Sequence, residues 1–480
     1  MNTRLSRQTA NQQSSLPGDQ RRRMAATLVA SAVALVAVSA YDPRAFAEDR
    51  SGPNLVFILA DDLGHGDLGC YGRPDVRTPA IDRLAAEGVR FTNCYANGPE
   101  CTPTRTAFLT GRYQQRVGGL ECAIGTGNVG RYDDAIRLRE TDDLGLPVEE
   151  TCIARMIKEA GYATGIVGKW HLGYSGKFSP NRHGFDYAFY ALGGGMDYYH
   201  HVETTGDHVL RLNETELRRP GYFTDLVSDE AVAFIDRHAG KPFFLYVPYT
   251  APHSPYQAPD AQPAEPLPES SPLQNQSQGP VEIYRAMIER MDQGVARIMR
   301  ALERHGLDEK TVVIFTSDNG ASKSGSNAPF SGHKGSTLEG GIRVPGIARW
   351  PGRLPRGATS DQPMLTMDFS GSLLRLAGAK PLANRGLDGI DILALVQSQS
   401  PVQSRPLFWR KRRGDSTWWA VRDGSMKYVR SSNGQKVEES LFDLDRDPAE
   451  QNNLLAARPE VVARLKGLLV EWEKQVAPRR

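Results

Sequence analysis

A short segment containing Cys101, Pro103 and Arg105 has residue types and spacing that suit chemistry on an anion. Pro103 fits the first position of a helix, because its missing N–H would have no partner there in any case. That placement puts Cys101 at the helix N-terminus, where free N–H groups and the helix dipole favour negative charge. The planar donors of Arg105 suit a tetrahedral oxyanion such as sulfate or phosphate. The alternative is a buried or disulfide-bonded cysteine beside an ion-paired arginine.

Carboxylates follow two largely apolar runs of the sequence. Residues 54–60 and 311–317 are typical of strands buried on both faces of a parallel sheet. The first run ends in Asp61 and Asp62, and the second in Asp318 and Asn319. Carboxylates at buried strand ends are costly unless a cation neutralises them, although solvated loop aspartates are the alternative. This all-oxygen set suits Ca²⁺ or Mg²⁺, and no Cys/His cluster has zinc spacing.

Basic side chains occupy comparable places. Lys169 and His171 follow a strand predicted at residues 162–167, and an extended backbone would direct both to one side. His253 lies between prolines after a strand predicted at residues 243–247, on a stiff loop. Lys334 lies in a Gly/Ser-rich loop after Asn319. Taken alone, Lys169 and His171 would more often be surface residues.

The elements that must position these groups alternate between strand and helix. Helices are predicted at residues 79–87, 149–160, 224–238 and 281–305, and a further strand at residues 89–96. Such alternation indicates an α/β protein, whose parallel strands line a ligand crevice with their carboxyl ends. We therefore expect the groups at the strand ends to converge, namely Asp61, Asp62, Lys169, His171, His253, Asp318 and Asn319. After residue 398, strands at 418–421, 426–429 and 441–444 and a helix at 461–476 predict a small antiparallel sheet covered by one helix.

The motif Cys-x-Pro-x-Arg at Cys101, followed by Phe-Leu-Thr-Gly-Arg at residues 108–112, closely resembles the signature of the type I sulfatases. Residues 161–173 resemble the second signature of that family, and residues 318–345 also resemble its pattern. The resemblance implies an alkaline-phosphatase-like fold, in which helices sandwich a large, mainly parallel sheet beside a smaller C-terminal antiparallel sheet. One departure is Glu100, where the family usually has an apolar or hydroxyl residue.

The resemblance also implies a mechanism. A formylglycine-generating enzyme would oxidise Cys101, and the hydrated aldehyde would attack sulfur and later release sulfate without help from water. The implied calcium ligands are Asp61, Asp62, Asp318, Asn319 and the formylglycine at Cys101. The implied sulfate-binding and catalytic residues are Arg105, Lys169, His171, His253 and Lys334. Of these, His253 or Lys334 would protonate the leaving alcohol.

The expected function is sulfuric ester hydrolysis of the arylsulfatase type, with a sulfated carbohydrate as the natural substrate and aryl sulfates as reporters. One alternative is a phosphatase or phosphodiesterase of the same superfamily, which would usually offer Thr or Ser and bind zinc. Another is a catalytically silent protein that binds sulfated sugars. In the glycine-rich stretch at residues 192–201, Asp197, Tyr198, His200 and His201 are predicted sugar contacts, and an ordinary glycine-rich loop is the alternative.

The first 47 residues predict export. Arginines at 21–23 precede an Ala/Val-rich run, and Ala-Phe-Ala at residues 45–47 gives a cleavage site before Glu48. We expect a signal peptide at 1–47, a catalytic domain at 48–397 and a C-terminal subdomain at 398–480. The mature protein would be periplasmic or secreted without a stable membrane span, and a retained anchor is the alternative. A net charge of +2 predicts no nucleic-acid partner. Besides Cys101, the four other cysteines could form up to two disulfides or remain buried thiols.

Overall fold

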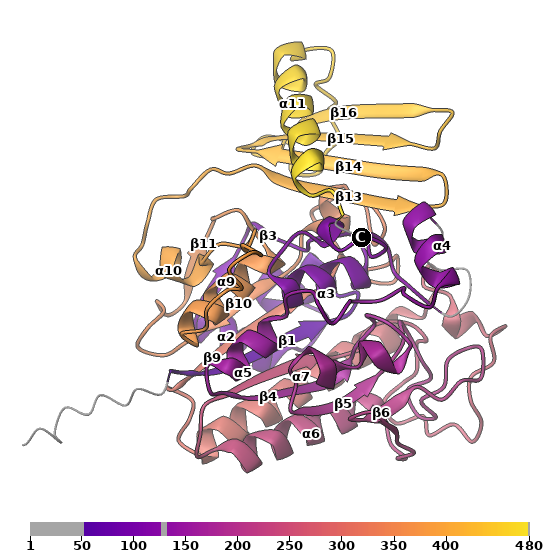
Figure 1. Ribbon diagram of the computed structural model, residues 1–480, viewed down its shortest axis with the longest axis vertical. Coiled ribbons are helices and arrows are strands. Elements are labelled where there is room, and N and C mark those ends of the chain that lie inside the picture. The colour runs from indigo at the N-terminus through magenta and orange to yellow at the C-terminus, as the bar shows by residue number, and fades with distance from the viewer. Residues whose placement is uncertain (1–51, 126–131, 479–480) are drawn as a thin grey trace, which may run out of the picture. The chain divides into compact units, whose positions relative to one another are not determined.

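The computed structural model describes residues 52–125 and 132–478, and Gly52–Arg480 is one compact unit. Its centre is a ten-stranded sheet in the order β11-β2-β10-β9-β1-β8-β4-β5-β6-β7 (Figure 1). The predicted export signal, residues 1–47, lies outside the described residues. In the part of the chain that is described, no helix has both the length and the apolar character needed to cross a membrane.

Three parallel strands form the middle of this sheet. They are β1 (Asn54–Ala60), β8 (Phe243–Pro248) and β9 (Thr311–Ser317), and all of their residues are buried. β1 pairs in parallel with both neighbours, so that Ala60 lies beside Ser317 and Leu59 beside Pro248. The three strands consequently end at one edge of the sheet, as their apolar runs predict.

The outer strands make the sheet mixed. β4 and β5 continue the parallel arrangement, β11 pairs in parallel with β2, and β10, β6 and β7 run antiparallel to their neighbours. Their bounds are β2 (Val89–Phe91), β4 (Ala163–Lys169), β5 (Tyr187–Ala191), β6 (Leu210–Leu212), β7 (Thr215–Glu216), β10 (Gly346–Arg349) and β11 (Ala358–Ser360). This confirms the predicted large, mainly parallel sheet.

Helices cover both faces of the sheet because side chains alternate along each buried strand. Val56 and Ile58 of β1 pack in one core, and Leu55 and Phe57 pack in the other. The first core includes α2 (Pro79–Glu87), α6 (Phe223–His238) and α7 (Val281–Arg304). The second includes α3 (Cys101–Thr110), α5 (Ile153–Glu159), α9 (Thr366–Leu376) and α10 (Ile392–Gln397). Shorter helices are α4 (Asp133–Glu140) and α8 (Glu339–Ile342).

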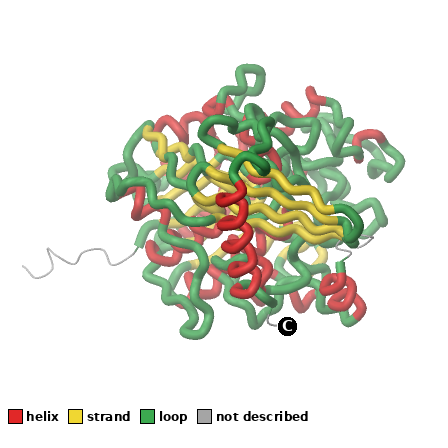
Figure 2. The backbone as a smooth tube through the Cα atoms, turned by 90° about the horizontal axis from the view of Figure 1, so that it is seen from above, coloured by secondary structure: helices red, strands yellow, loops and turns green. Residues whose placement is uncertain are grey.

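The C-terminal part forms a second, four-stranded antiparallel sheet. It consists of β13 (Leu407–Arg413), β14 (Ser416–Asp423), β15 (Met426–Ser432) and β16 (Val437–Asp443). The helix α11 (Pro459–Gln475) lies across one face of it (Figures 1 and 2). A third core joins this sheet to the rest of the unit, and the buried Trp409 donates from Nε1 to the carbonyl of Ala96 at 2.8 Å. The predicted sheet and covering helix are confirmed.

Three local predictions are wrong. The strand predicted at residues 89–96 is two strands, because β2 pairs in the large sheet whereas β3 (Cys94–Tyr95) pairs with β12 (Met364–Leu365). α5 starts at Ile153, three residues after Glu150. α3 starts at Cys101 itself, so Pro103 is its third residue, a place where the backbone N–H is still not needed for a helical hydrogen bond.

Candidate active site

The acidic residues at the ends of β1 and β9 meet around Cys101. The thiol of Cys101 lies 3.2 Å from Oδ1 of Asp61, and the backbone N–H of Asp62 donates to Oδ1 of Asp318 at 3.3 Å. Nδ2 of Asn319 donates to Asp62 at 2.8 Å, whereas its buried Oδ1 has no hydrogen-bond partner. Among the described residues, one ligand atom each from Asp61, Asp62, Cys101 and His253 lies within 4.8 Å of the others.

Three buried or nearly buried cations neutralise these carboxylates. Arg105, on α3, donates from Nη2 to Asp318 at 2.8 Å. Lys169, the last residue of β4, forms an ion pair with Asp61. Lys334 approaches from the loop after β9, and its Nζ lies 2.8 Å from Asp62. The charges converge because the strands that carry or precede them end at the same edge of the sheet.

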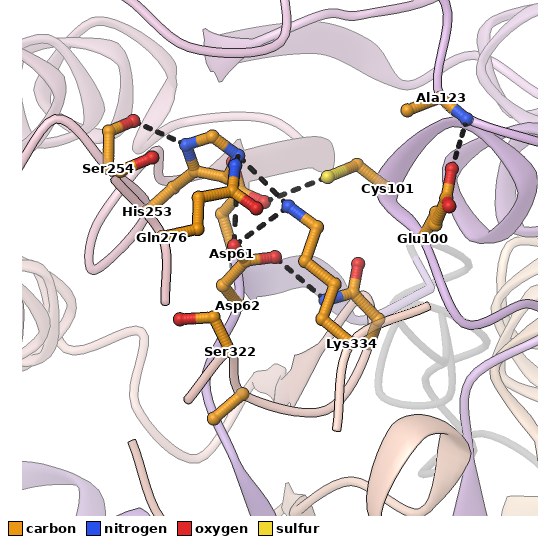
Figure 3. Close-up of polar contacts among 12 residues, drawn as sticks. Asp61, Asp62, Glu100, Cys101, Ala123, His253, Ser254, Gln276, Ser322 and Lys334 are labelled. Carbon is orange, nitrogen blue, oxygen red and sulfur yellow. Dashed lines mark hydrogen bonds and ion pairs between the residues drawn. The ribbon is translucent and has the colours of Figure 1, made fainter. Parts of the chain in front are cut away.

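His253 faces Lys334 and Asp62 (Figure 3). Its Nδ1 lies 2.5 Å from the carbonyl oxygen of Ser254. A carbonyl only accepts, so Nδ1 carries the proton and Nε2 presents a lone pair. Lys334 donates to that lone pair at 3.1 Å, and Gln276 approaches it at 3.3 Å. The structure thus defines the neutral tautomer of His253.

His171 reaches the same place with a backbone that differs from the prediction. It has φ of 57°, in the left-handed region, so it does not continue the extended chain of Lys169. Its Nε2 lies 2.6 Å from the carbonyl of Ile124, and its buried Nδ1 has no partner. The glycine stretch makes room for this ring, because a Cβ on Gly194 would lie 2.8 Å from it. Both His171 and Lys169 nevertheless border the cluster.

The carboxyl groups differ in pKa. Burial by itself would raise the pKa of Asp62, but Lys334 and His253 outweigh it and lower that pKa to about 2. Burial raises the pKa of Asp318 to about 6 in spite of Arg105. Asp62 is therefore held as an anion, whereas Asp318 binds a proton more readily.

Burial also dominates at the histidine and the cysteine. Burial, together with the positive charge of Lys334, lowers the pKa of His253 to about 3. Burial and the neighbouring Asp61 raise the pKa of the Cys101 thiol well above its ordinary value. An unmodified Cys101 is therefore a protonated thiol at neutral pH, which is a weak nucleophile.

A cavity of about 910 Å³ lies beside the cluster. Cys101, His171, His253 and Lys334 line it, together with segments from the glycine stretch, the loop before α7 and strand β13. Such a volume is near the upper end of the range for pockets that hold small organic ligands. The cavity can therefore admit a ligand larger than the sulfate group alone.

Only one of the four predicted sugar contacts lines the cavity. Asp197 does so, but its carboxylate also accepts from the backbone N–H groups of Tyr199, His200 and Leu267. Tyr198 is fully buried and donates to the carbonyl of His253, so its hydroxyl supports the loop from behind. His200 lies beside Asp197, and His201 points to the carbonyl of Gly221. The structure does not bring these last three side chains to the cavity.

Four other residues that line the cavity were not predicted from the sequence. Glu100, Lys411, Arg413 and Gln276 all line the cavity. Lys411 and Arg413 alternate along β13, and two-residue spacing within a basic run is a signal that one strand face carries charge. Burial would raise the pKa of Glu100, but Lys411 and Arg413 lower it to about 2. The departure at Glu100 is thus compensated by cations from the C-terminal sheet.

The five cysteines, all within the described residues, are free thiols. Cys70 is half-buried and the other four are buried. No disulfide therefore joins Cys70, Cys94, Cys122 and Cys152 in this structure, which corresponds to the buried-thiol alternative.

Two family models match the chain. The model described as Sulfatase matches residues 53–379, and the model described as N-sulphoglucosamine sulphohydrolase, C-terminal, matches residues 333–475. Among solved structures, the crystal structure of Ps i-CgsB is 30% identical, covers 89% of this chain and 93% of its own, and has a TM-score of 0.76. The phosphonate monoester hydrolase of Agrobacterium radiobacter, at 20% identity and a TM-score of 0.63, shares the fold.

Curated relatives agree with these matches. The N-acetylgalactosamine-6-sulfatase of Canis lupus familiaris is 34% identical over 94% of this chain and 90% of its own length. The steryl-sulfatase of Mus musculus is 32% identical over 76% of this chain and 68% of its own length. The acidic residues and cations gather around the Cys101 motif, and the chain belongs to the sulfatase family and is a sulfatase.

Proposed function

We propose that this sulfatase removes sulfate from a carbohydrate by means of formylglycine at position 101 and one bound Ca²⁺. The observation that carries the proposal is the meeting of Asp61, Asp62 and Asp318 with Arg105, Lys169 and Lys334 around the Cys101 side chain. Carboxylates suit a hard cation, and the fixed cations suit the oxygens of a sulfate ester. Of these groups, Cys101 and Lys334 line the cavity, and the others are buried beside them.

The residues present fit a calcium ion. Asp61, Asp62, Asp318 and Asn319 offer oxygen donors, and the buried Oδ1 of Asn319 has no other partner. Ca²⁺ accepts six to eight oxygen ligands in a flexible geometry, whereas Mg²⁺ demands a near-ideal octahedron and retains several waters. When bound, the ion would offset the negative charge of the sulfate group. Calcium is therefore the proposed ion.

The residue at position 101 is proposed to be formylglycine, whose hydrated aldehyde supplies a hydroxyl nucleophile. An unmodified thiol at this place would stay protonated, because burial raises its pKa. It lies at the N-terminus of α3, where free N–H groups favour an anion. Arg105 donates from the first turns of the same helix and Lys169 from the end of β4, so both are fixed by packing. These cations would hold the sulfate oxygens and stabilise charge that builds on them.

Proton delivery is assigned to the pair of His253 and Lys334. Nε2 of His253 and Nζ of Lys334 lie 3.1 Å apart, and both residues line the cavity. A donor at this place can reach an ester oxygen whose sulfur is held between Cys101 and the cations. His171 also lines the cavity; because its Nε2 donates to the carbonyl of Ile124, its unpartnered Nδ1 can accept one further hydrogen bond.

The cavity wall favours a carbohydrate over a sterol. Its lining includes several hydroxyl and amide side chains, namely Thr204, Thr205, Gln274, Gln276, Ser277 and Ser322. A sterol would leave such groups without hydrogen bonds, whereas sugar hydroxyls can pair with them. The relative Ps i-CgsB has been crystallised with k-i-k-neocarrahexaose, at 29% identity to this chain and a TM-score of 0.75. The proposed substrate is accordingly a sulfated saccharide.

Export and maturation belong to the same proposal. The signal-like residues 1–47 would direct the chain to the periplasm or outside the cell, and a formylglycine-generating enzyme would modify Cys101. The divisions at 47/48 and 397/398 remain predictions.

The decisive experiment joins peptide mass spectrometry at position 101 with an aryl sulfate assay on the same preparation. We expect an aldehyde in place of the thiol in active protein. Cys101→Ala should lower turnover by more than about 10³-fold, since no other group supplies the nucleophile. Full activity with an entirely unmodified Cys101 would refute the mechanism. Faster cleavage of phosphate than of sulfate esters, with stoichiometric zinc, would favour the phosphatase alternative, and binding without turnover would favour the silent one.

A further inference from the structure

We propose that Lys411 is a positioning residue for sulfate ester hydrolysis, because it binds the segment before Cys101 and the segment after Lys334 at the same time. The inference rests on the proposed function, in which position 101 supplies the nucleophile and Lys334 faces the leaving oxygen. Lys411 lies on β13, in the C-terminal sheet, far along the sequence from both motifs. It would act through these two segments without touching the sulfur.

The contacts of Lys411 define a clamp, by which we mean its bonds to Glu100 and Gly335. Its Nζ lies 2.9 Å from Oε1 of Glu100 and 2.9 Å from the carbonyl oxygen of Gly335. Glu100 immediately precedes Cys101, and Gly335 immediately follows Lys334. One ammonium group therefore links the two chain segments that carry the reacting groups.

Further hydrogen bonds of Gly335 and Glu100 support the clamp. The backbone N–H of Gly335 donates to the carbonyl of Pro99 at 2.8 Å, which joins the same two segments a second time. The other carboxylate oxygen of Glu100 accepts from the N–H of Ala123 at 2.7 Å (Figure 3) and from Arg413 at 2.8 Å. Each carboxylate oxygen of Glu100 thus has fixed donors. Its side chain can hold one orientation only while these donors remain.

The clamp is buried, which strengthens the attraction between its charges. The side chains of Lys411 and Glu100 are 7% and 6% exposed, so water competes little for their charges. The ammonium group also lies 4.6 Å from the centre of the Trp418 ring, and this cation–π contact is a third interaction that limits its movement. Glu100 stands at the N-cap position of α3 but makes no side-chain cap to that helix. Its carboxylate is used for the C-terminal sheet instead.

Loss of the clamp should affect catalysis more than binding. Without Lys411, the loop that carries Lys334 keeps its bond to Asp62 but loses one of its two links to the Cys101 segment. A misplacement of about 1 Å between reacting groups can cost about a hundredfold in rate. We expect Lys411→Met to lower kcat on an aryl sulfate about tenfold or more, with KM changed less than about twofold.

Arg410 provides the matched control on the same strand. It also bridges the two parts of the unit, with bonds of 2.7 Å to Glu121 and 3.0 Å to Glu473, and its side chain is 13% exposed. It does not line the cavity. Arg410→Met therefore removes a buried bridge of the C-terminal sheet without touching the clamp, and its kcat should stay within about twofold of wild type. Equal losses of kcat in both variants would show that only the docking of the sheet matters, and the proposal would be wrong.

Two further measurements test the clamp without relying on folding of one variant or on turnover. Glu100→Gln removes the charge that pairs with Lys411, so the loss of kcat in a double variant with Lys411→Met should be smaller than the two single losses combined. Hydrogen exchange at the Gly335 amide should be faster in Lys411→Met than in wild type and unchanged in Arg410→Met. Unchanged exchange in Lys411→Met would overturn the proposal. A wild-type protein without sulfatase activity would overturn the proposed function, while the exchange result would still decide whether the clamp exists.

Discussion

Lys427 offers a quantitative test of how the C-terminal sheet is held to the catalytic part. Its fully buried Nζ lies 2.8 Å from Oε1 of Glu339, in α8, and 2.9 Å from Oε1 of Glu450. Burial would raise the pKa of Glu339, but Lys427 and two arginines lower it to about 2. The substitution Lys427→Met keeps much of the side-chain length and removes the charge. It leaves two buried carboxylates with too few cations.

The expected loss in the free energy of unfolding is set by the cost of protonating one of the two carboxylates. If one of them takes up a proton at pH 7, the cost is about 3.4 kcal/mol, because about 2.5 pKa units separate 7 from the ordinary value of 4.5 and each unit corresponds to about 1.36 kcal/mol. Glu339 keeps Arg343 at 3.1 Å, so Glu450 is the group expected to become neutral. The figure agrees with the roughly 3–5 kcal/mol lost when one partner of a buried ion pair is removed.

Low pH should reduce the loss of stability caused by Lys427→Met. The cost of protonating Glu450 falls as the pH falls toward the ordinary carboxyl pKa of 4.5, because the unfolded chain then takes up the same proton. The penalty for Lys427→Met should therefore be smaller at pH 4 than at pH 7. Urea unfolding followed by tryptophan fluorescence at both pH values measures it. Lys436→Met, at an exposed ion pair of the same sheet, is the control and should leave the unfolding midpoint unchanged. A penalty below about 1 kcal/mol at pH 7, or one that is the same at both pH values, would refute the reasoning.

Three further predictions concern the catalytic part and the N-terminus. Asp318→Asn should lower turnover by more than about 10³-fold and abolish the binding of one Ca²⁺ per chain, as measured by elemental analysis, while the circular dichroism spectrum stays the same; stoichiometric calcium in this variant would contradict the ligand assignment. Gly194→Ala would place a methyl group 2.8 Å from the ring of His171 and should lower kcat at least about tenfold, whereas Gly176→Ala, which meets open space, should have no effect. Sequencing of exported protein should find Glu48 or a neighbouring residue at the N-terminus, and a retained Met1 would exclude cleavage.

The sequence predicted those parts of the site that depend on strand order. Apolar runs that end in Asp61 and Asp318 indicate buried parallel strands, and parallel strands end at one edge whatever lies between them. The convergence of these residues with Lys169 therefore needed no knowledge of loop conformation, whereas Cys101 was placed beside them by the family resemblance. The large sheet was predicted to be mainly parallel, but neither its ten strands nor the division of residues 89–96 between two sheets was predicted.

The remainder of the site depends on loop conformation and on contacts between distant segments. Asp197 and Tyr198 look like sugar contacts by type, but Asp197 accepts from nearby backbone N–H groups, as a short acidic side chain in a turn commonly does. The type of a loop residue does not say where its side chain points. Lys411 and Arg413 were missed for the opposite reason, since they belong to a sheet whose docking on α3 no local pattern reveals.

Both edges of the large sheet are formed by short strands, which limits its association with other chains. Its outermost strands, β7 (Thr215–Glu216) and β11 (Ala358–Ser360), have two and three residues, whereas the central β1 and β9 have seven. A short edge strand presents few unpaired N–H and C=O groups on which another strand could assemble. The ten strands can therefore be wide enough to carry a deep, charged cavity at one end without exposing a long template for aggregation.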